Sequence, residues 1–373
     1  MQFPVIGPFA NSLGSSPALV GIIVAAYSFT NLIGNLAAGV ILDRWGRNLP
    51  IQIGLLFTAI SLFGYVISTS PEQLLIARCI HGLSASMLAP GAFAIIGDSS
   101  LEKSRVKVMG RSSAPIAGAA LVGPMISAFL GRAAGYPTVF ATSAVIMLIV
   151  LIVFFISSRT ERIAIPNKSA NDRLSAGYGQ LSYLRLSIAY LAALSLTIGL
   201  GALVTHLPTS LIAQGQPSSA SGPPFTAFAV IATLIMASPA ASFANHYGRL
   251  TPIAIGLGLI SGGLLFLSIM SGMSGAIIGM VIFGSGFGIL FPTMTTLVTE
   301  ATSPMNRGRA FGVFYAVYSL GVVIGSGVSG MLADAYGEIS GTPFLLGATA
   351  TLTIAVFTIA IGRLQPHVLQ NKK

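Results

Sequence analysis

Charged side chains are scarce in this chain. Only 8% of its 373 residues are Asp, Glu, Lys or Arg, and 54% are hydrophobic, whereas a typical soluble domain is about 25% charged. So few charges could not cover the surface of a soluble protein of this length. Cysteine is scarcer still, because Cys79 is the only one, and this excludes a disulfide framework or a cysteine-rich metal site.

The chain is rich instead in apolar runs near the length of about 20 residues that crosses a bilayer. Such runs form helices, because no water is available there to satisfy open backbone groups, and their continuous apolar character differs from the alternation of a β-barrel. The sequence predicts an all-α polytopic membrane protein, with eleven complete transmembrane helices after an apolar stub at 1–13. The expected spans are 17–42, 49–69, 72–98, 107–131, 135–157, 183–212, 223–244, 250–271, 273–300, 305–333 and 342–363.

Basic residues gather on one side of this topology. If the spans alternate, seventeen of the nineteen Lys and Arg residues share a side, and the exceptions are Arg132 and Arg78. The positive-inside rule makes that side cytoplasmic, so we expect a multi-pass protein of the cell membrane with its long central loop and C-terminus in the cytoplasm. The net charge of +10 then reports orientation and contact with the lipid bilayer rather than nucleic-acid binding.

The chain also repeats itself at an offset of 202 residues. Asp43-Arg44-Trp45-Gly46-Arg47 aligns with Asn245-His246-Tyr247-Gly248-Arg249, and Pro90 aligns with Pro292. Two six-helix halves in parallel repeat are typical of transporters. We expect an N-terminal bundle over 1–157, a cytoplasmic inter-bundle loop over 158–182 and a C-terminal bundle over 183–373.

The same offset places residue 1 opposite residue 203, near the end of the span at 183–212. About 20 residues of a first transmembrane helix therefore have no counterpart at the start of the chain. We expect an N-terminal truncation in helix 1, with residues 1–13 as its remnant, in preference to an eleven-helix design.

The loop Gly39-Val-Ile-Leu-Asp43-Arg44-Trp-Gly46-Arg47 resembles the loop 2–3 signature of the major facilitator superfamily. The segment Arg78-Cys-Ile-His81-Gly82 is similar to that family's fourth-helix signature, with His81 in place of the usual Gln. Gly118 and the Gly123-Pro124 pair resemble its fifth-helix antiporter motif, although Ser127 and Ala128 replace two glycines. The resemblance implies two pseudo-symmetric six-helix bundles, most like the twelve-helix drug:proton antiporter group.

The resemblance implies a role for the loop. In the family, the aspartate and arginines of this signature latch the two halves together at the N-terminus of a helix, which the start signal at Thr302-Ser303-Pro304 places near 305. The simpler interpretation is a polar turn with topogenic arginines. The expected latch residues are Gly39, Asp43, Arg44, Gly46 and Arg47, and the repeat copy carries Gly248 and Arg249.

Three ionisable residues inside spans are candidates for the cavity or for coupling. Arg78 lies about six residues into its span, where an arginine is costly and is usually paired or faces a wet cavity, although snorkelling to the outer surface is the alternative. His81 lies one turn further on and can substitute for the family's Gln or carry a proton. His206 precedes Pro208 and suggests a polar group in the cavity.

An aromatic series at helical spacing could form an apolar wall for a lipophilic substrate, or serve packing or lipid contact instead. Its members are Met280, Phe283, Phe287 and Phe291. The sequence offers no phosphate-binding loop, no metal-ligand pair at helical spacing and no nucleophile with a base, so we expect neither an enzyme nor a cofactor.

We therefore expect secondary active transport by alternating access, most simply proton-coupled efflux of small lipophilic or amphipathic compounds by a monomer. Carboxylates are absent from the middle of the eleven complete spans, so the proton remains only a possible coupling ion. The alternatives are a metabolite or sugar carrier of the same family, or a truncated membrane protein that does not transport.

Overall fold

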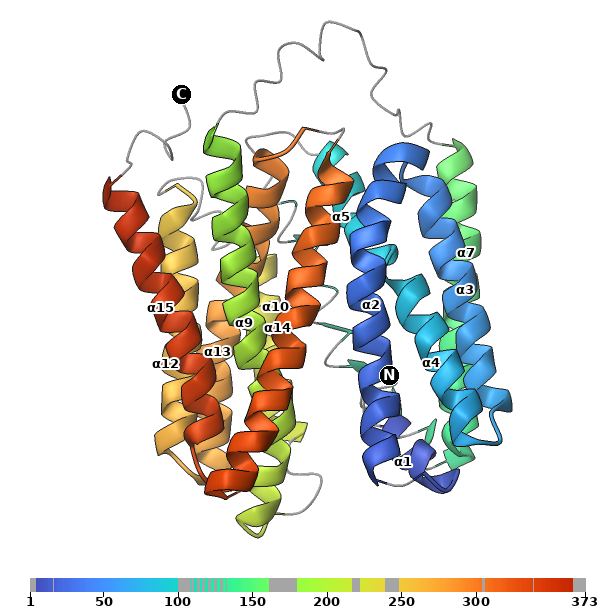
Figure 1. The fold of residues 1–373 in the computed structure, drawn as a ribbon, viewed down its shortest axis with the longest axis horizontal. Coiled ribbons are helices and arrows are strands. Elements are labelled where there is room, and N and C mark those ends of the chain that lie inside the picture. Colours follow the sequence, from blue (N-terminus) through green and yellow to red (C-terminus); the bar gives the residue numbers. More distant parts are fainter. Residues whose placement is uncertain are drawn as a thin grey trace, which may run out of the picture. The chain divides into compact units, whose positions relative to one another are not determined.

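The computed structural model describes residues 5–15, 17–99, isolated positions between 108 and 131, and 133–160, 180–216, 222–238, 248–303, 306–337 and 339–364. The regular elements within these residues are α-helices (Figure 1). In chain order they are α1 (Ile6–Ser12), α2 (Pro17–Trp45), α3 (Asn48–Ile67), α4 (Pro71–Ala85), α5 (Leu88–Ser99), α7 (Tyr136–Thr160), α9 (Gln180–Ala213), α10 (Gly222–Ala237), α12 (Leu250–Ile269), α13 (Gly272–Glu300), α14 (Arg307–Tyr336) and α15 (Thr342–Leu364).

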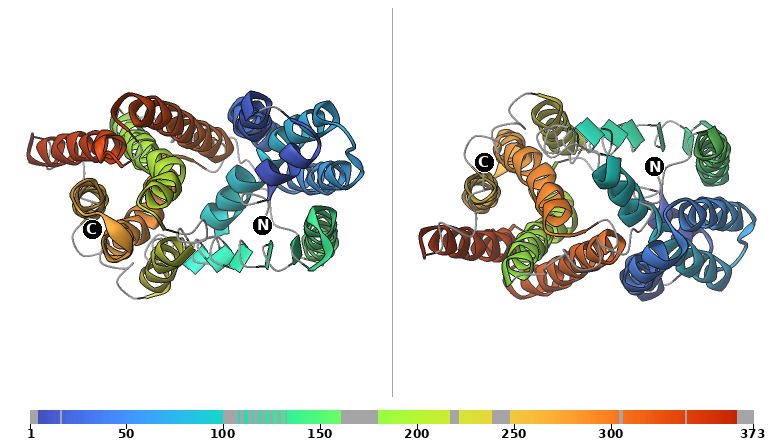
Figure 2. Two further views of the ribbon diagram at one scale, coloured as in Figure 1. Left: turned by 90° about the horizontal axis from the view of Figure 1, so that it is seen from below. Right: turned by 90° about the horizontal axis from the view of Figure 1, so that it is seen from above.

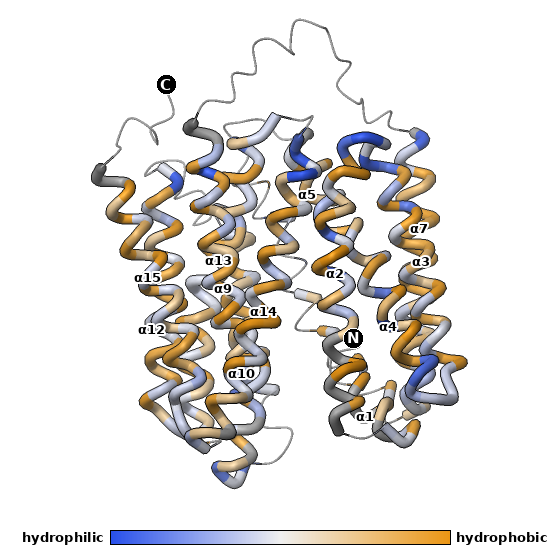
Figure 3. Tube along the Cα trace, in the orientation of Figure 1, coloured by the Kyte–Doolittle hydropathy of each residue, from blue (hydrophilic) through white to orange (hydrophobic). Residues whose placement is uncertain are grey.

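Each predicted span that the structure describes is helical over most of its described length, and the exceptions are one or two residues near span ends and one internal turn. Eight helices in the described ranges are long and apolar enough to cross a membrane, and α10 is a shorter apolar helix. Hydrophilic residues gather where helices end, most clearly at the connection between α2 and α3 (Figure 3). The expected span at 107–131 falls mostly outside the described residues.

One expected span contains a turn. The span at 72–98 is found as one membrane-crossing element, Pro71–Gly97, and a turn at Ser86 and Met87 divides it into α4 and α5. Pro90 has no N–H to donate to the Ser86 carbonyl, which weakens the helix at this turn. Its repeat counterpart Pro292 lies inside an uninterrupted α13, so the proline permits the break without enforcing it.

The chain divides into two compact units. The first comprises Met1–Asp98, Val122–Tyr178 and Thr302–Ala316, and the second comprises Ser99–Leu121, Gly179–Ala301 and Val317–Lys373. The first unit therefore includes the beginning of α14, although the rest of that helix belongs to the second. End-on views show the helices of each unit as a bundle (Figure 2).

Each bundle packs around its own apolar centre. In the first unit, α2, α3, α4 and α7 surround a core that includes Phe9, Leu62, Tyr65, Leu74 and Phe140. In the second, α12 packs on both α13 and α15, and α10 packs on α13. Burial of such side chains and close helix packing hold each bundle together.

The internal repeat reappears in the helix boundaries. The bounds of α3 and α12 differ by 202 residues at both ends, which is the offset found in the sequence. Gly54 of α3 lies against the Ser84 carbonyl, and its counterpart Gly256 of α12 lies against the Gly286 carbonyl. The two halves thus use the same helix crossing, and glycine allows the backbones to approach.

Candidate functional site

The turn between α2 and α3 depends on a glycine. Gly46 has a φ of +81°, in the left-handed region that favours glycine. It reverses the chain between Trp45, the last residue of α2, and Asn48, the first of α3. Gly248, its counterpart before α12, has a φ of +75°, so both copies of the loop need glycine at this place.

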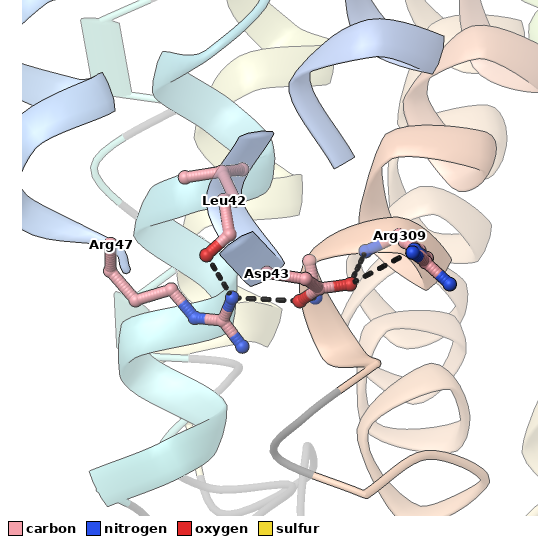
Figure 4. A network of polar contacts seen from close by, with 5 residues as sticks. Leu42, Asp43, Arg47 and Arg309 are labelled. Carbon is pink, nitrogen blue, oxygen red and sulfur yellow. Dashed lines mark hydrogen bonds and ion pairs between the residues drawn. The ribbon is translucent and has the colours of Figure 1, made fainter. Parts of the chain in front are cut away.

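Asp43 lies at the centre of a polar network at this turn (Figure 4). Its Oδ1 accepts hydrogen bonds from the amide of Gly308 at 2.9 Å and from Nη1 of Arg47 at 2.8 Å, and its Oδ2 accepts from the amide of Arg309 at 2.9 Å. Arg47 also donates to the Leu42 carbonyl at 2.6 Å. The carboxylate is 5% exposed, and it satisfies amides in the first turn of α14 that have no partner within the helix.

Glycines bring α2 and α14 into contact beside Asp43. A Cβ added to Gly39 would lie 2.7 Å from Cα of Arg309, and one added to Gly312 would lie 2.5 Å from the Asn35 carbonyl oxygen. Both distances are shorter than real Cβ contacts allow. Only glycine therefore fits at this crossing, which holds the Asp43 carboxylate within reach of the α14 amides.

Arg44 takes no part in this network. Its side chain is exposed, whereas Arg47 and the α14 amides hold Asp43. The other four expected latch residues lie close together. Gly39 is at the crossing of α2 and α14, and Asp43, Gly46 and Arg47 are at the turn between α2 and α3. Their role in the transport cycle stays a prediction.

The repeat copy of the loop makes a different contact. Arg249 donates from Nη2 to Oε1 of Glu300 at 2.7 Å and from Nε to Oε2 at 3.1 Å, which links the start of α12 to the last residue of α13. Asn245 stands where the first copy has Asp43. The pairing with Glu300 was not anticipated from the sequence.

Arg78 and His81 lie together inside the first unit. Arg78 is 6% exposed and His81 is 5% exposed. Arg78 donates from Nε to the Ile23 carbonyl at 3.1 Å, and its guanidinium lies 5.0 Å from the ring centroid of Tyr27. Nδ1 of His81 lies 2.8 Å from Oη of Tyr65. The guanidinium thus contacts α2 at Ile23 and Tyr27, and His81 contacts α3 at Tyr65.

His206 makes a contact between helices of the second unit. Its Nε2 donates to the Ser340 carbonyl at 2.8 Å, and its ring packs edge-on against Phe344. The residue is buried. This contact ties α9 to the connection between α14 and α15, which is a packing role for His206, and the cavity role expected from the sequence stays a prediction.

The four apolar residues of the expected cavity wall are buried in the second unit. Phe283 and Phe287 of α13 pack against Phe228 of α10, and Phe287 stacks on Phe291 with centroids 5.4 Å apart. Phe291 in turn contacts Tyr318 of α14. Met280 is 1% exposed. These contacts give the series a role in packing α13 against its neighbours.

The fifth-helix motif is described only in part. Gly123 is buried, and its carbonyl accepts a hydrogen bond from Ser127 at 2.6 Å. None of the described residues lies within 4 Å of where a Cβ on Gly118 would be. Pro124 lies outside the described residues.

Two residues of the first unit were missed from the sequence. Tyr27 and Tyr65 contact Arg78 and His81 but belong to no local motif. A signal was available in the repeat, because both are polar residues of predicted spans whose counterparts 202 residues later are apolar. Because the fold is the same in both copies, a polar residue with an apolar counterpart is not needed for the fold and is a candidate for another role.

Comparison with known proteins gives consistent results. The family model described as Major Facilitator Superfamily matches residues 1–302 and 215–373. Multidrug resistance protein 1 of Bacillus subtilis is 29% identical over 364 residues, which cover 96% of this chain and 91% of that protein. Quinolone resistance protein NorA of Staphylococcus aureus is 26% identical over 347 residues, which cover 91% of this chain and 87% of that protein.

Solved structures share the fold. The human organic anion transporter MFSD10 matches with a TM-score of 0.74 at 19% identity, over 95% of this chain and 88% of that one. The proton:xylose symporter XylE matches with a TM-score of 0.77 at 17% identity, over 94% of this chain and 88% of that one. Because the family model spans the whole sequence, the chain belongs to the major facilitator superfamily, whose members are membrane transporters and not enzymes.

Proposed function

We propose that this protein exports small lipophilic or amphipathic compounds by alternating access, in exchange for protons entering the cell. The similarity to a multidrug resistance protein and to NorA along nearly the full chain carries this proposal. The composition agrees with it, because the described spans offer many apolar side chains and few polar groups, which suits a weakly hydrated substrate.

The network at Asp43 supplies the conformational element of the proposal. A carboxylate that accepts from two amides at a helix N-terminus makes a strong but reversible contact. In the cycle, this contact between the end of α2 and the start of α14 forms in one state and breaks in the other. Arg47 keeps the carboxylate oriented while the contact is made.

The orientation and assembly belong to the same proposal. The basic side faces the cytoplasm of a cell membrane, and one chain is the transporting unit, with a proton as coupling ion and no bound cofactor. Substrate then leaves the cytoplasm as protons return along their gradient.

Transport of a fluorescent dye across everted membrane vesicles tests the proposal. We expect ethidium to accumulate in vesicles that contain the protein when a pH gradient, acidic inside, is imposed, and we expect a protonophore to abolish accumulation. Empty vesicles are the control. Dye movement that is indifferent to the gradient would contradict proton exchange, and no dye movement with saturable uptake of a sugar would favour a metabolite carrier instead.

A further inference from the structure

The span that holds α4 and α5 differs from its repeat counterpart at the same proline. A turn at Ser86 and Met87 separates α4 from α5 before Pro90, whereas α13 continues through Pro292. At the turn, the amide of Met87 donates to the carbonyl three residues earlier at 3.4 Å, and the hydroxyl of Ser86 donates to the carbonyl three residues earlier at 2.6 Å. A proline and a serine bonded to a helix carbonyl both favour bending at such a point.

Stacked rings brace α13 at its proline. Phe287 and Phe291 lie one turn apart just before Pro292, and their rings stack with centroids 5.4 Å apart and 15° between the planes. The ring of Phe287 also packs against α10. The residues 202 positions earlier are Ala85 and Ala89, which have no rings to span the turn. The first copy of this span is therefore free of the brace that the second copy has.

Beyond the turn, α5 contacts the beginning of α14. Phe93 of α5 is 2% exposed, and its ring stacks on Phe311 with centroids 5.9 Å apart and lies 6.1 Å from the ring of Tyr315. The first turn of α14 also carries the amides that bind Asp43, so α5 and the carboxylate contact the same part of α14. The counterpart of Phe93 in α13 is Thr295, which shows that the shared fold does not require a ring at this position.

We infer that the turn between α4 and α5 is a hinge of the transport cycle, and that Phe93 is the positioning residue that couples this hinge to the beginning of α14. The inference rests on the proposed transport function. When α5 swings about the turn, its stacked ring draws the first turns of α14 with it. The hinge and the contact at Asp43 therefore change state together, while the braced α13 moves as one helix.

The two prolines supply a matched pair of variants. Pro90→Ala provides an N–H that can donate to the Ser86 carbonyl, and it favours a continuous helix. Pro292→Ala makes the same change in α13, where the helix is already continuous. Phe93→Leu keeps an apolar side chain and removes the ring that stacks on Phe311.

We expect Pro90→Ala to lower the maximal rate of ethidium transport about tenfold at an unchanged or higher Tm, because the hinge is lost while the helix gains a hydrogen bond. Pro292→Ala should transport within about twofold of the wild type. Phe93→Leu should lower the rate about fivefold and leave the KM unchanged, the effect of one aromatic pair on a conformational step. The double variant of Pro90→Ala and Phe93→Leu should be no slower than Pro90→Ala alone, because both changes interrupt one coupling.

Two results of these rate measurements would overturn the inference in favour of a structural role. One is an equal fall for Pro90→Ala and Pro292→Ala. The other is a double variant whose losses multiply to about fiftyfold. A wild-type rate for Pro90→Ala would overturn the hinge itself.

Distances across the turn test the hinge without transport, so a chain that moves no ethidium would contradict the proposed function alone. In a Cys79→Ser background, spin labels at Ile76→Cys on α4 and Ala92→Cys on α5, both exposed positions, report the separation of the two helices by pulsed EPR in nanodiscs. We expect a broad distance distribution in the wild type and in Pro292→Ala, and a narrow one in Pro90→Ala. Equal widths in the wild type and in Pro90→Ala would overturn the inference.

Discussion

Arg249 holds the carboxylate of Glu300 by two hydrogen bonds, at 2.7 and 3.1 Å, and both side chains are largely buried. The pair fastens the first turn of α12 to the last residue of α13. In the first unit, the equivalent Arg47 binds Asp43, which also reaches the amides of α14. The same loop therefore makes different contacts in the two units. In the second unit its arginine pairs with a carboxylate of another helix, whereas in the first unit its arginine and the α14 amides bind one carboxylate.

The Arg249–Glu300 pair should contribute to stability. Glu300→Gln removes the charge of the carboxylate that Arg249 binds, so we expect the free energy of unfolding to fall by about 3 kcal/mol, measured as a lower Tm in detergent. Arg309→Gln is the control, because Arg309 is 52% exposed and 3.9 Å from Asp43, and its loss should cost less than about 1 kcal/mol. Equal Tm values for Glu300→Gln and the wild type would contradict the assignment.

Asp43 should control the transport rate. Asp43→Asn removes the charge and replaces one of the two oxygens that accept from the α14 amides with an NH2 donor. We expect the maximal rate of dye transport to fall about tenfold at normal expression. Arg44→Gln should transport as well as the wild type, because Arg44 lies outside the network. A fall in transport rate equal to that of Asp43→Asn would contradict this and show that Arg44 belongs to the latch.

Much of the fold could be predicted because the bilayer imposes it. Apolar runs of spanning length and the 202-residue offset gave helices that the structure places within a few residues, as at α3 and α12. The turn between α4 and α5 could not be predicted from the sequence, since Pro90 and Pro292 occupy equivalent positions in the two repeat copies. Whether a proline interrupts a helix depends on neighbours that satisfy the freed carbonyl, and these are tertiary contacts.

The candidate site was predictable only where a motif is local. The turn at Gly46 and the position of Arg78 within a span follow from short patterns. The partners of Arg78 and His81 come from α2 and α3, at sequence distances of 55 residues to Ile23 and 16 between Tyr65 and His81. No periodicity within one helix predicts such pairs. The one indication in the sequence is that Tyr27 and Tyr65 are polar where their repeat counterparts are apolar.

The crossing of α2 and α14 should not tolerate a side chain. Gly312→Ala places a Cβ against the Asn35 carbonyl, which is backbone and cannot rotate away. We expect slower transport and a loss of about 1–3 kcal/mol of stability, measured by dye flux and Tm. Gly327→Ala, in the same helix, meets nothing within 4 Å and should be neutral or stabilise by about 0.5–1 kcal/mol. Identical behaviour of the two variants would show that the crossing is not tight.

Single cysteines should reveal the orientation. Cys79→Ser first removes the one native thiol, and then Thr69→Cys places a cysteine in the exposed connection between α3 and α4, while Ser175→Cys places one in the basic central connection. A membrane-impermeant maleimide added to intact cells should label the first variant and not the second, because in the proposed orientation the side that carries seventeen basic residues faces the cytoplasm. In everted vesicles the labelling should reverse. The opposite pattern in both preparations would mean that the basic side faces outward, and export would then have to be replaced by uptake as the direction of transport.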